Sequence, residues 1–270
     1  MRGKLGFCGA LIAAMFCFAA SAQAEPGQVN GPAQVKMRGD ALCDVPAKCL
    51  FVEEAQAKAF LEKHNPPDPT VIGMLVHEEE KWMAVFSYED IGYVKDEDRD
   101  AFKSDAKVSE LLDYIRQGTE EANKWRRQHN APEMRLVGWE VRPEYDSQLN
   151  KLIWGVQYHD QANYSSKVLG RHGVVSIELI GDVGQSAKMV GALRNVTNRV
   201  TFAKGATYAE WTSGDKVAAV GLTGLVAVGA AAAVAKNPKA WKAIIAIGAA
   251  ALAGIGWVFK KIKGLFGGGE

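Results

Sequence analysis

Residues 136–180, LVGWEVRPEYDSQLNKLIWGVQYHDQANYSSKVLGRHGVVSIELI, indicate the fold class of this chain. Three runs rich in β-branched and aromatic residues, at 136–141, 152–158 and 174–180, are typical of strands and are separated by turn-forming residues. The runs follow one another closely enough to form hairpins, and helical patterns do not alternate with them regularly. We therefore expect an α+β fold, with a mainly antiparallel sheet and packed helices.

Patterns on either side of this stretch extend the same domain. Apolar residues at helical spacing predict helices over 53–64, 109–129 and 186–200. Strict alternation of side chains predicts a further strand over 82–88. Because about 190 residues can bury a sufficient core without additional cross-links, we expect one α+β domain over residues 25–213.

The charge balance of this domain excludes one large class of function. The whole chain has a formal net charge of +1, but much of its positive charge lies at the two ends. Residues 25–215 contain 23 Lys and Arg against 30 Asp and Glu, so their net charge is −7. Nucleic-acid binding normally needs a basic face that displaces counterions from phosphates. We therefore expect no nucleic-acid partner.

Residues 1–24 are typical of a secretory signal peptide. A basic start precedes an apolar run over 5–20, and the sequence AQA at 22–24 forms a cleavage site of the small-x-small type. Cleavage there makes Glu25 the first residue of the mature chain. An uncleaved anchor is the disfavoured alternative, because the run is shorter than the roughly 20 residues that a membrane helix needs. We therefore expect the domain to be exported.

Two of the four cysteines lie in the signal peptide, so the exported chain keeps Cys43 and Cys49. In an oxidising compartment these two residues are expected to form a local disulfide. The bond would close the short loop CDVPAKC and contribute about 2 kcal/mol by the chain-entropy model. The spacing is not CxxC and no histidine is close in sequence, so a redox-active or metal-binding pair is disfavoured.

The C-terminal part of the chain is strongly apolar. Residues 217–235 contain no charge and, at about 1.5 Å per helical residue, match the roughly 30 Å hydrocarbon thickness of a bilayer. A lysine-rich turn follows, and then a second apolar run, 243–259, which ends at further lysines. We predict a transmembrane helix over 217–235 and a second transmembrane or interfacial helix over 243–259, with a helical hairpin favoured. Small residues at four-residue spacing would allow helix-mediated self-association in lipid, although alanine-rich helices also carry such stripes by chance.

Motifs that run along the chain identify a family resemblance. They are NPPDP (65–69), GYVKDED (92–98), GTEEANK (118–124), GWEVRPEYD (138–146), NYSSKVLGRHGV (163–174) and GDKVAAVGL (214–222). Together they resemble a bacterial family of uncharacterised membrane-anchored proteins, defined as a domain of unknown function. The resemblance implies an exported domain tethered by C-terminal membrane segments, with no established reaction. With the signal peptide, it implies an inner-membrane protein whose main domain lies on the periplasmic side.

Patterns for catalysis and metal binding are incomplete. Asp96, Asp98 and Asp100 have the spacing that begins a calcium loop, but Ala101 replaces the turn glycine and Lys107 replaces the closing glutamate. A solvated loop is the favoured interpretation. The five histidines show no metal-ligand spacing, and no nucleophile elbow, phosphate-binding loop or dinucleotide fingerprint occurs. We therefore expect no metal and no cofactor, and we identify no catalytic residue.

An aromatic and polar group of residues is the remaining candidate for a site. Aromatic rings offer flat apolar area, and neighbouring polar groups fix orientation, so such groups can hold sugars or peptides. A buried core stripe explains most of these aromatic residues better than a ligand groove. The ligand-binding candidates are Tyr145, Asp146, Asn163 and Arg171, because they lie in turn-rich sequence.

Two functions from different classes stay open. The favoured one is a non-enzymatic envelope protein whose exported domain binds a protein or cell-wall ligand near the membrane. The alternative is a hydrolase directed at an envelope polysaccharide or peptide, in which Asp146 acts with Glu140 or Glu144 as acid and base. Glycoside cleavage needs two such carboxylates about 5 to 10 Å apart. The sequence contains an anchor but no catalytic set, so we favour binding.

Overall fold

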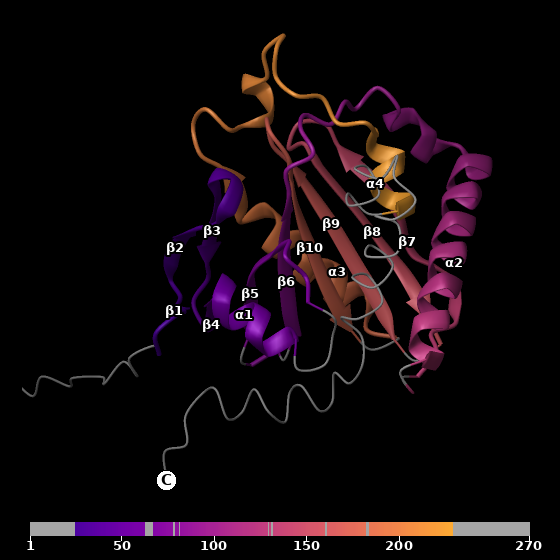
Figure 1. The fold of residues 1–270 in the computed structure, drawn as a ribbon, viewed down its shortest axis with the longest axis horizontal. Coiled ribbons are helices and arrows are strands. Elements are labelled where there is room, and N and C mark those ends of the chain that lie inside the picture. The colour runs from indigo at the N-terminus through magenta and orange to yellow at the C-terminus, as the bar shows by residue number, and fades with distance from the viewer. Residues whose placement is uncertain are drawn as a thin grey trace, which may run out of the picture.

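The computed structural model describes residues 25–62, 67–77, 79–80, 82–128, 130, 132–159, 161–181 and 184–228. The predicted signal peptide 1–24 and the second apolar run 243–259 lie outside these residues. The described part has an α+β fold with a large antiparallel sheet and few helices, as the sequence predicts (Figure 1).

The main sheet has eight strands, and neighbouring strands are antiparallel throughout. Across the sheet they are β1 (Gln28–Asn30), β4 (Cys49–Glu53), β5 (Val71–His77), β6 (Trp82–Glu89), β10 (Val174–Gly181), β9 (Ala162–Leu169), β8 (Lys151–Tyr158) and β7 (Leu136–Asp146). Strands β7 to β10 follow one another as a meander, so residues 136–181 build half of the sheet. The strand that the sequence patterns missed here is β9, whose NYSSKVL segment mixes polar and apolar residues on both faces.

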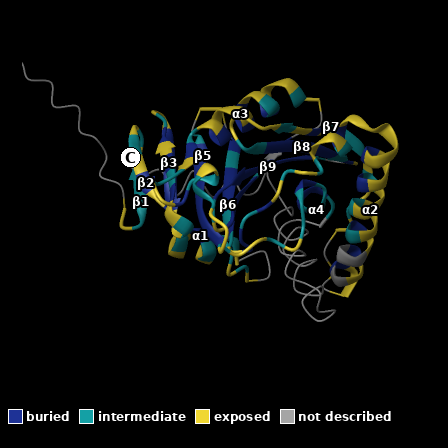
Figure 2. Cartoon of the chain, turned by 90° about the horizontal axis from the view of Figure 1, so that it is seen from above, coloured by how far each residue is buried: buried dark blue, intermediate teal, exposed yellow. Residues whose placement is uncertain are grey.

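One face of the main sheet is covered by a small sheet and a helix. The small sheet is antiparallel, with the order β11 (Val200–Phe202), β3 (Ala41–Val45) and β2 (Ala33–Lys36). It packs together with α3 (Ser186–Asn198), and Figure 2 shows α3 on the other side of the strands from α1 and α4. Phe86, Ile177 and Leu193 are almost completely buried between these layers. Burial of side chains of this size contributes about 1.5 to 3 kcal/mol each.

The opposite face is covered by two separate groups of helices. The short helix α1 (Glu54–Leu61) packs on β4 and β5, where Met74 is buried. At the other edge, α2 (Asp105–Gln128) and α4 (Leu222–Val228) cover the apolar residues of β8, including Trp154. The strands between the two groups, β6, β10 and β9, carry a buried set of charged side chains on this same face.

Helix α4 is formed by residues that the sequence analysis assigns to the membrane helix 217–235. In the structure its side chains belong to the domain core, where Leu222 and Leu225 are 0% exposed and Val226 is 3% exposed. No helix among the described residues is both long enough and apolar enough to span a bilayer. The remaining residues of the predicted membrane helix, 229–235, lie outside the described part.

Candidate functional site

The four predicted ligand-binding residues lie in two places. Tyr145 and Asp146 are the last residues of β7. In the strand register, Asp146 lies opposite Lys151 of β8, and Lys151 lies opposite Val168, near the end of β9 and three residues before Arg171. Asn163 lies at the start of β9, so it is separated from Arg171 by about 26 Å of extended chain. The structure therefore brings Tyr145, Asp146 and Arg171 to one end of the sheet and leaves Asn163 near the other.

We call the first place the loop end, comprising residues 90–99, 146–150, 170–173 and 203–217. Backbone contacts join three of these segments, 90–99, 170–173 and 203–217. Gly92 N–H donates to the carbonyl of His172 (2.9 Å), and Arg171 N–H donates to the carbonyl of Ala206 (2.9 Å). A parallel bridge also pairs Tyr93 with residue 217. Segments distant in sequence thus form one surface.

A stack of aromatic rings lies within the loop end. Tyr93 stacks on Tyr208, with ring centroids 4.4 Å apart, and on Trp211, with centroids 5.1 Å apart. The Tyr208 hydroxyl donates to the carbonyl of Val94 (2.8 Å), which fixes the ring. Burial raises the pKa of Tyr208 and of nearby Tyr145, so both phenols are neutral at ordinary pH. All three residues of the stack are half-buried.

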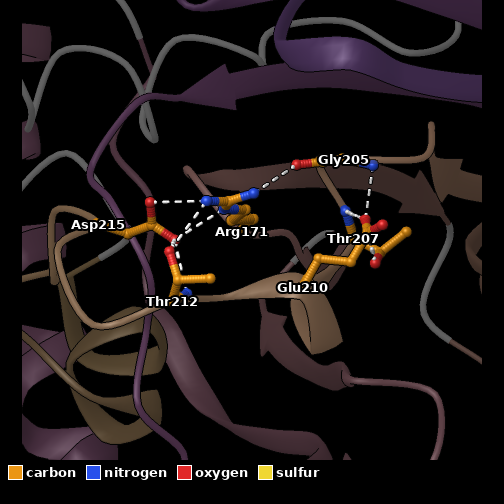
Figure 3. A network of polar contacts seen from close by, with 6 residues as sticks. All are labelled: Arg171, Gly205, Thr207, Glu210, Thr212 and Asp215. Atoms are coloured by element: carbon orange, nitrogen blue, oxygen red, sulfur yellow. Dashed lines mark hydrogen bonds and ion pairs between the residues drawn. The ribbon is translucent and has the colours of Figure 1, made fainter.

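Arg171 fastens the segment 203–217 to the sheet (Figure 3). Its guanidinium donates to both carboxylate oxygens of Asp215, with Nε–Oδ2 at 2.7 Å and Nη2–Oδ1 at 3.0 Å. It also donates to Thr212 Oγ1 (3.1 Å) and to the carbonyl of Gly205 (3.3 Å). The hydrogen bonds from Arg171 hold the pKa of the Asp215 carboxyl well below its usual range. A bidentate pair of this kind fixes orientation as well as distance.

A carboxylate organises the other half of the same segment. Glu210 Oε2 accepts hydrogen bonds from Gly205 N–H (2.7 Å), Thr207 N–H (3.0 Å) and Thr207 Oγ1 (2.7 Å). Thr207 and Glu210 form a capping box at the short helix η3 (Tyr208–Glu210) that carries Tyr208. These bonds set the position of the aromatic stack before any ligand arrives.

The carboxylates of the hydrolase hypothesis are engaged in local contacts. Asp146 Oδ1 accepts from the backbone N–H groups of Gln148 (2.9 Å) and Leu149 (3.0 Å), which closes the turn between β7 and β8. Glu144 forms an exposed ion pair with Arg194 (2.7 Å). Both side chains therefore make contacts that stabilise the fold.

The face of the main sheet that α1 and α4 cover contains buried charged side chains that sequence patterns did not predict. We call them the buried charge cluster (Glu89, Lys167 and Glu178, with Ser165 and Ser176). Lys167 is 3% exposed, and its ammonium lies 3.5 Å from Glu89 Oε1 and donates to Ser176 Oγ. Ser176 Oγ in turn donates to Glu89 (2.8 Å), and Ser165 Oγ donates to Glu178 (2.7 Å). Charges in such a position need partners, and here each has one.

The buried charge cluster binds protons more readily than exposed carboxylates do. Burial raises the pKa of Glu178 to about 7 and raises the pKa of Glu89, while the charge of Lys167 opposes both shifts.

Asn163 lies two residues before Ser165 on the same face of β9, where Gln161 Nε2 donates to its Oδ1 (3.3 Å). The sequence signal for the buried charge cluster was the polar residue at every second position of β9, Asn163, Ser165 and Lys167. Such alternation normally indicates a strand face exposed to solvent.

Cys43 and Cys49 are both buried in the structure. Cys43 lies in β3 and Cys49 begins β4. Burial raises the pKa of the Cys43 thiol to about 12. The predicted disulfide is therefore not shown and stays a prediction for the oxidised, exported chain.

The acidic residues near position 98 have structural partners. Asp96 pairs with Arg99 (3.0 Å) and Asp100 pairs with Lys103 (2.6 Å), both near the protein surface. Asp98 accepts hydrogen bonds from the start of α4. Within the described ranges, no cluster of three or more His, Cys, Asp or Glu residues is arranged to hold a metal ion.

A cleft of about 470 Å³ lies between α2 and α4. Its lining residues are Asp98, Ala101, Lys107, Glu110, Leu111, Tyr114, Thr223, Gly224 and Ala227. Lys107 and Glu110 form an ion pair across 2.9 Å, and Tyr114 donates to the same glutamate (3.3 Å). The charged groups that line the cleft therefore already have partners within the protein.

Comparison with known proteins defines the family. Residues 29–256 match a family described as "Protein of unknown function (DUF2167)". The chain belongs to this family. No curated protein matches it. Among solved structures it is similar to the solution structure of cyanobacterial PsbP (CyanoP) from Synechocystis sp. PCC 6803, with a TM-score of 0.36 and 11% identity over 74% of this chain and 100% of that chain.

Membership in an uncharacterised family agrees with the resemblance seen in the motifs. The match extends from β1 through α4 and past the end of the described residues. The matched region therefore includes the described domain and most of the apolar run 243–259.

Proposed function

We propose that this protein is an exported, membrane-anchored domain of the bacterial envelope that binds a partner protein through its loop end. The observation that carries the proposal is the aromatic stack of Tyr93, Tyr208 and Trp211, held in place by the contacts of Arg171 and Glu210. The signal peptide and apolar tail support export and anchoring.

The composition of the loop end suits a protein partner. Half-buried aromatic rings supply a large contact area at a low cost in conformational entropy. Exposed charged residues of both signs, Lys95, Glu97 and Lys216, lie on the same segments of the loop end as the rings. An aromatic centre with a polar rim is the usual anatomy of a transient protein interface. The bonds within 203–217 lower the ordering cost of binding, because the segment is folded in advance.

Site-specific photocrosslinking in intact cells tests the proposal directly. The photoreactive residue p-benzoylphenylalanine would replace Lys95 or Ser213, which are exposed at the loop end, or Val137, which is 56% exposed near the opposite end. We expect Lys95 and Ser213 to give the same discrete protein adduct and Val137 to give none. Equal adducts from all three positions, no adduct, or an adduct only to cell-wall polymer would contradict a protein-binding loop end.

A second arm tests whether the folded state of 203–217 matters. Arg171→Ala removes the bonds to Asp215, Thr212 and Gly205, and it should reduce the loop-end adduct several-fold while the domain stays folded. Arg194→Ala is the matched control, because it removes only the surface pair with Glu144. Arg171 is thus a positioning residue, and an adduct yield that is equal in both variants would remove it from the proposal.

A further inference from the structure

The chain leaves the loop end along a path fixed by backbone contacts. Tyr93 N–H donates to the carbonyl of Lys216 (2.8 Å), and Ala218 N–H donates to the carbonyl of Tyr93 (2.8 Å). These two bonds flank the parallel bridge between Tyr93 and Val217. The first residues of the predicted membrane helix are therefore paired with the folded domain.

The start of α4 is fixed by a side chain from a distant part of the sequence. Asp98 accepts from the backbone N–H groups of Leu222 (2.9 Å) and Thr223 (2.9 Å), and from Thr223 Oγ1 (2.6 Å). These are the donors that a helix start leaves without intrahelical partners. Gly221 permits the approach, because a Cβ there would lie 2.7 Å from Asp98 Oδ1.

The apolar residues of α4 complete the core beneath it. Leu222, Leu225 and Val226 belong to the same buried cluster as Phe102 and Trp154. Residues 217–228 cannot hold these positions and face lipid at the same time. Seven uncharged residues, 229–235, then remain before Lys236, and as a helix they reach about 10 Å, a third of the bilayer's hydrocarbon thickness.

We propose that residues 217–228 belong to the exported domain and that the chain crosses the bilayer once, through residues 243–259. Seventeen residues reach about 26 Å, which a slightly thinned bilayer accommodates. The lysines at 236, 239 and 242 then lie on the domain's side, and those at 260, 261 and 263 lie in the cytoplasm. With three lysines on each side, the positive-inside tendency does not distinguish this topology from the hairpin. A single span replaces the helical hairpin that hydropathy favours. The topology rests on the export and anchoring in the proposed function, but it does not depend on the proposed partner protein.

Cysteine labelling of the full chain tests this topology. Lys239→Cys and Lys261→Cys would be treated with a membrane-impermeant maleimide in intact cells and again after permeabilisation. We expect Lys239→Cys to react in intact cells and Lys261→Cys to react only after permeabilisation. The unsubstituted chain gives the background, since Cys43 and Cys49 are buried.

The other labelling patterns each overturn the proposal. Reaction of Lys261→Cys alone in intact cells would establish the hairpin. Reaction of both variants in intact cells would mean that the second run does not cross, and reaction of neither would place position 239 inside the cell. If the expected pattern holds but the loop-end crosslink is missing, the topology stands and the binding proposal falls.

Discussion

At the scale of single residues, the buried charge cluster makes folding sensitive to pH. The Glu178 carboxyl has a pKa of about 7 in the folded protein, against 4.5 as its ordinary value. The folded state therefore binds a proton more tightly than the unfolded state does. The stability linked to this proton is fully present below about pH 4.5 and is lost as the pH rises through about 7. Glu89, whose pKa is also raised, contributes in the same direction.

We predict that the free energy of unfolding falls by up to about 3 kcal/mol between about pH 5 and pH 9 because of Glu178. Glu178→Gln should remove most of this dependence, since an amide does not titrate. Urea unfolding at both pH values measures it. Glu97→Gln is the control, because Glu97 is 76% exposed and makes only a surface pair. Parallel pH curves for the wild type and Glu178→Gln would contradict the assignment.

The two buried cysteines yield a second prediction at this scale. We expect the exported chain to contain the Cys43–Cys49 disulfide, which the structure does not show. Both sulfurs should then resist alkylation in denaturant and become alkylated only after a reductant is added. Mass spectrometry of the treated chain distinguishes the two forms. Alkylation in denaturant without reductant would show that the pair stays reduced.

At the scale of elements, α4 depends on a carboxylate more than 120 positions earlier in the chain. We predict that Asp98→Ala destabilises the domain by about 1 to 2 kcal/mol, the usual cost of losing a helix cap. Chemical unfolding measures the change. Asp100→Ala is the matched control, because Asp100 is 74% exposed and its pair with Lys103 should contribute almost nothing. Equal effects of the two variants would mean that Asp98 does not hold α4.

Local periodicity predicted the elements whose pattern lies within one segment. The helices expected over 53–64, 109–129 and 186–200 appear as α1, α2 and α3, because each has an apolar stripe that its own sequence displays. The short strands β2, β3 and β11 were not predicted, since three to five residues carry too little alternation. Their pairing is set by distant partners, which one sequence does not reveal.

The role of Asp98 shows the same limit for single side chains. Its spacing from Asp96 and Asp100 suggested a failed calcium loop, whereas in the structure it caps a helix that begins at Leu222. Hydropathy likewise predicted a membrane helix over 217–235, because the stretch contains no charge, whereas in the structure Leu222, Leu225 and Val226 of this stretch lie in the domain core. The contacts that distinguish a core helix from a membrane helix here join α4 to residues far away in the sequence, such as Asp98 and Trp154.

At the scale of the whole molecule, the fold brings three of the four candidate residues to the same end of the sheet. Tyr145, Asp146 and Arg171 lie at the same end of the sheet because the turns at one edge of an antiparallel meander lie together. Asn163 does not join them, since it lies a full strand away from Arg171. The aromatic stack was missed because Tyr93, Tyr208 and Trp211 come from segments that only the fold brings together.

At the same scale, the sequence connects the folded domain to an apolar run that can enter a membrane. The described residues form a domain whose last helix, α4, is part of the core, and a charged turn and the apolar run 243–259 follow it in sequence. A loop end that is folded in advance and a tether on the same chain would hold a binding surface near the bilayer. Such an arrangement requires export of the domain and retention at the membrane.

Fractionation of cells that express the full chain, followed by intact-mass measurement, tests this requirement most directly. We predict that the protein stays with the membranes until detergent is added and that its mass corresponds to a chain beginning at Glu25. A protein that is released without detergent and still carries Met1 would contradict both export and anchoring.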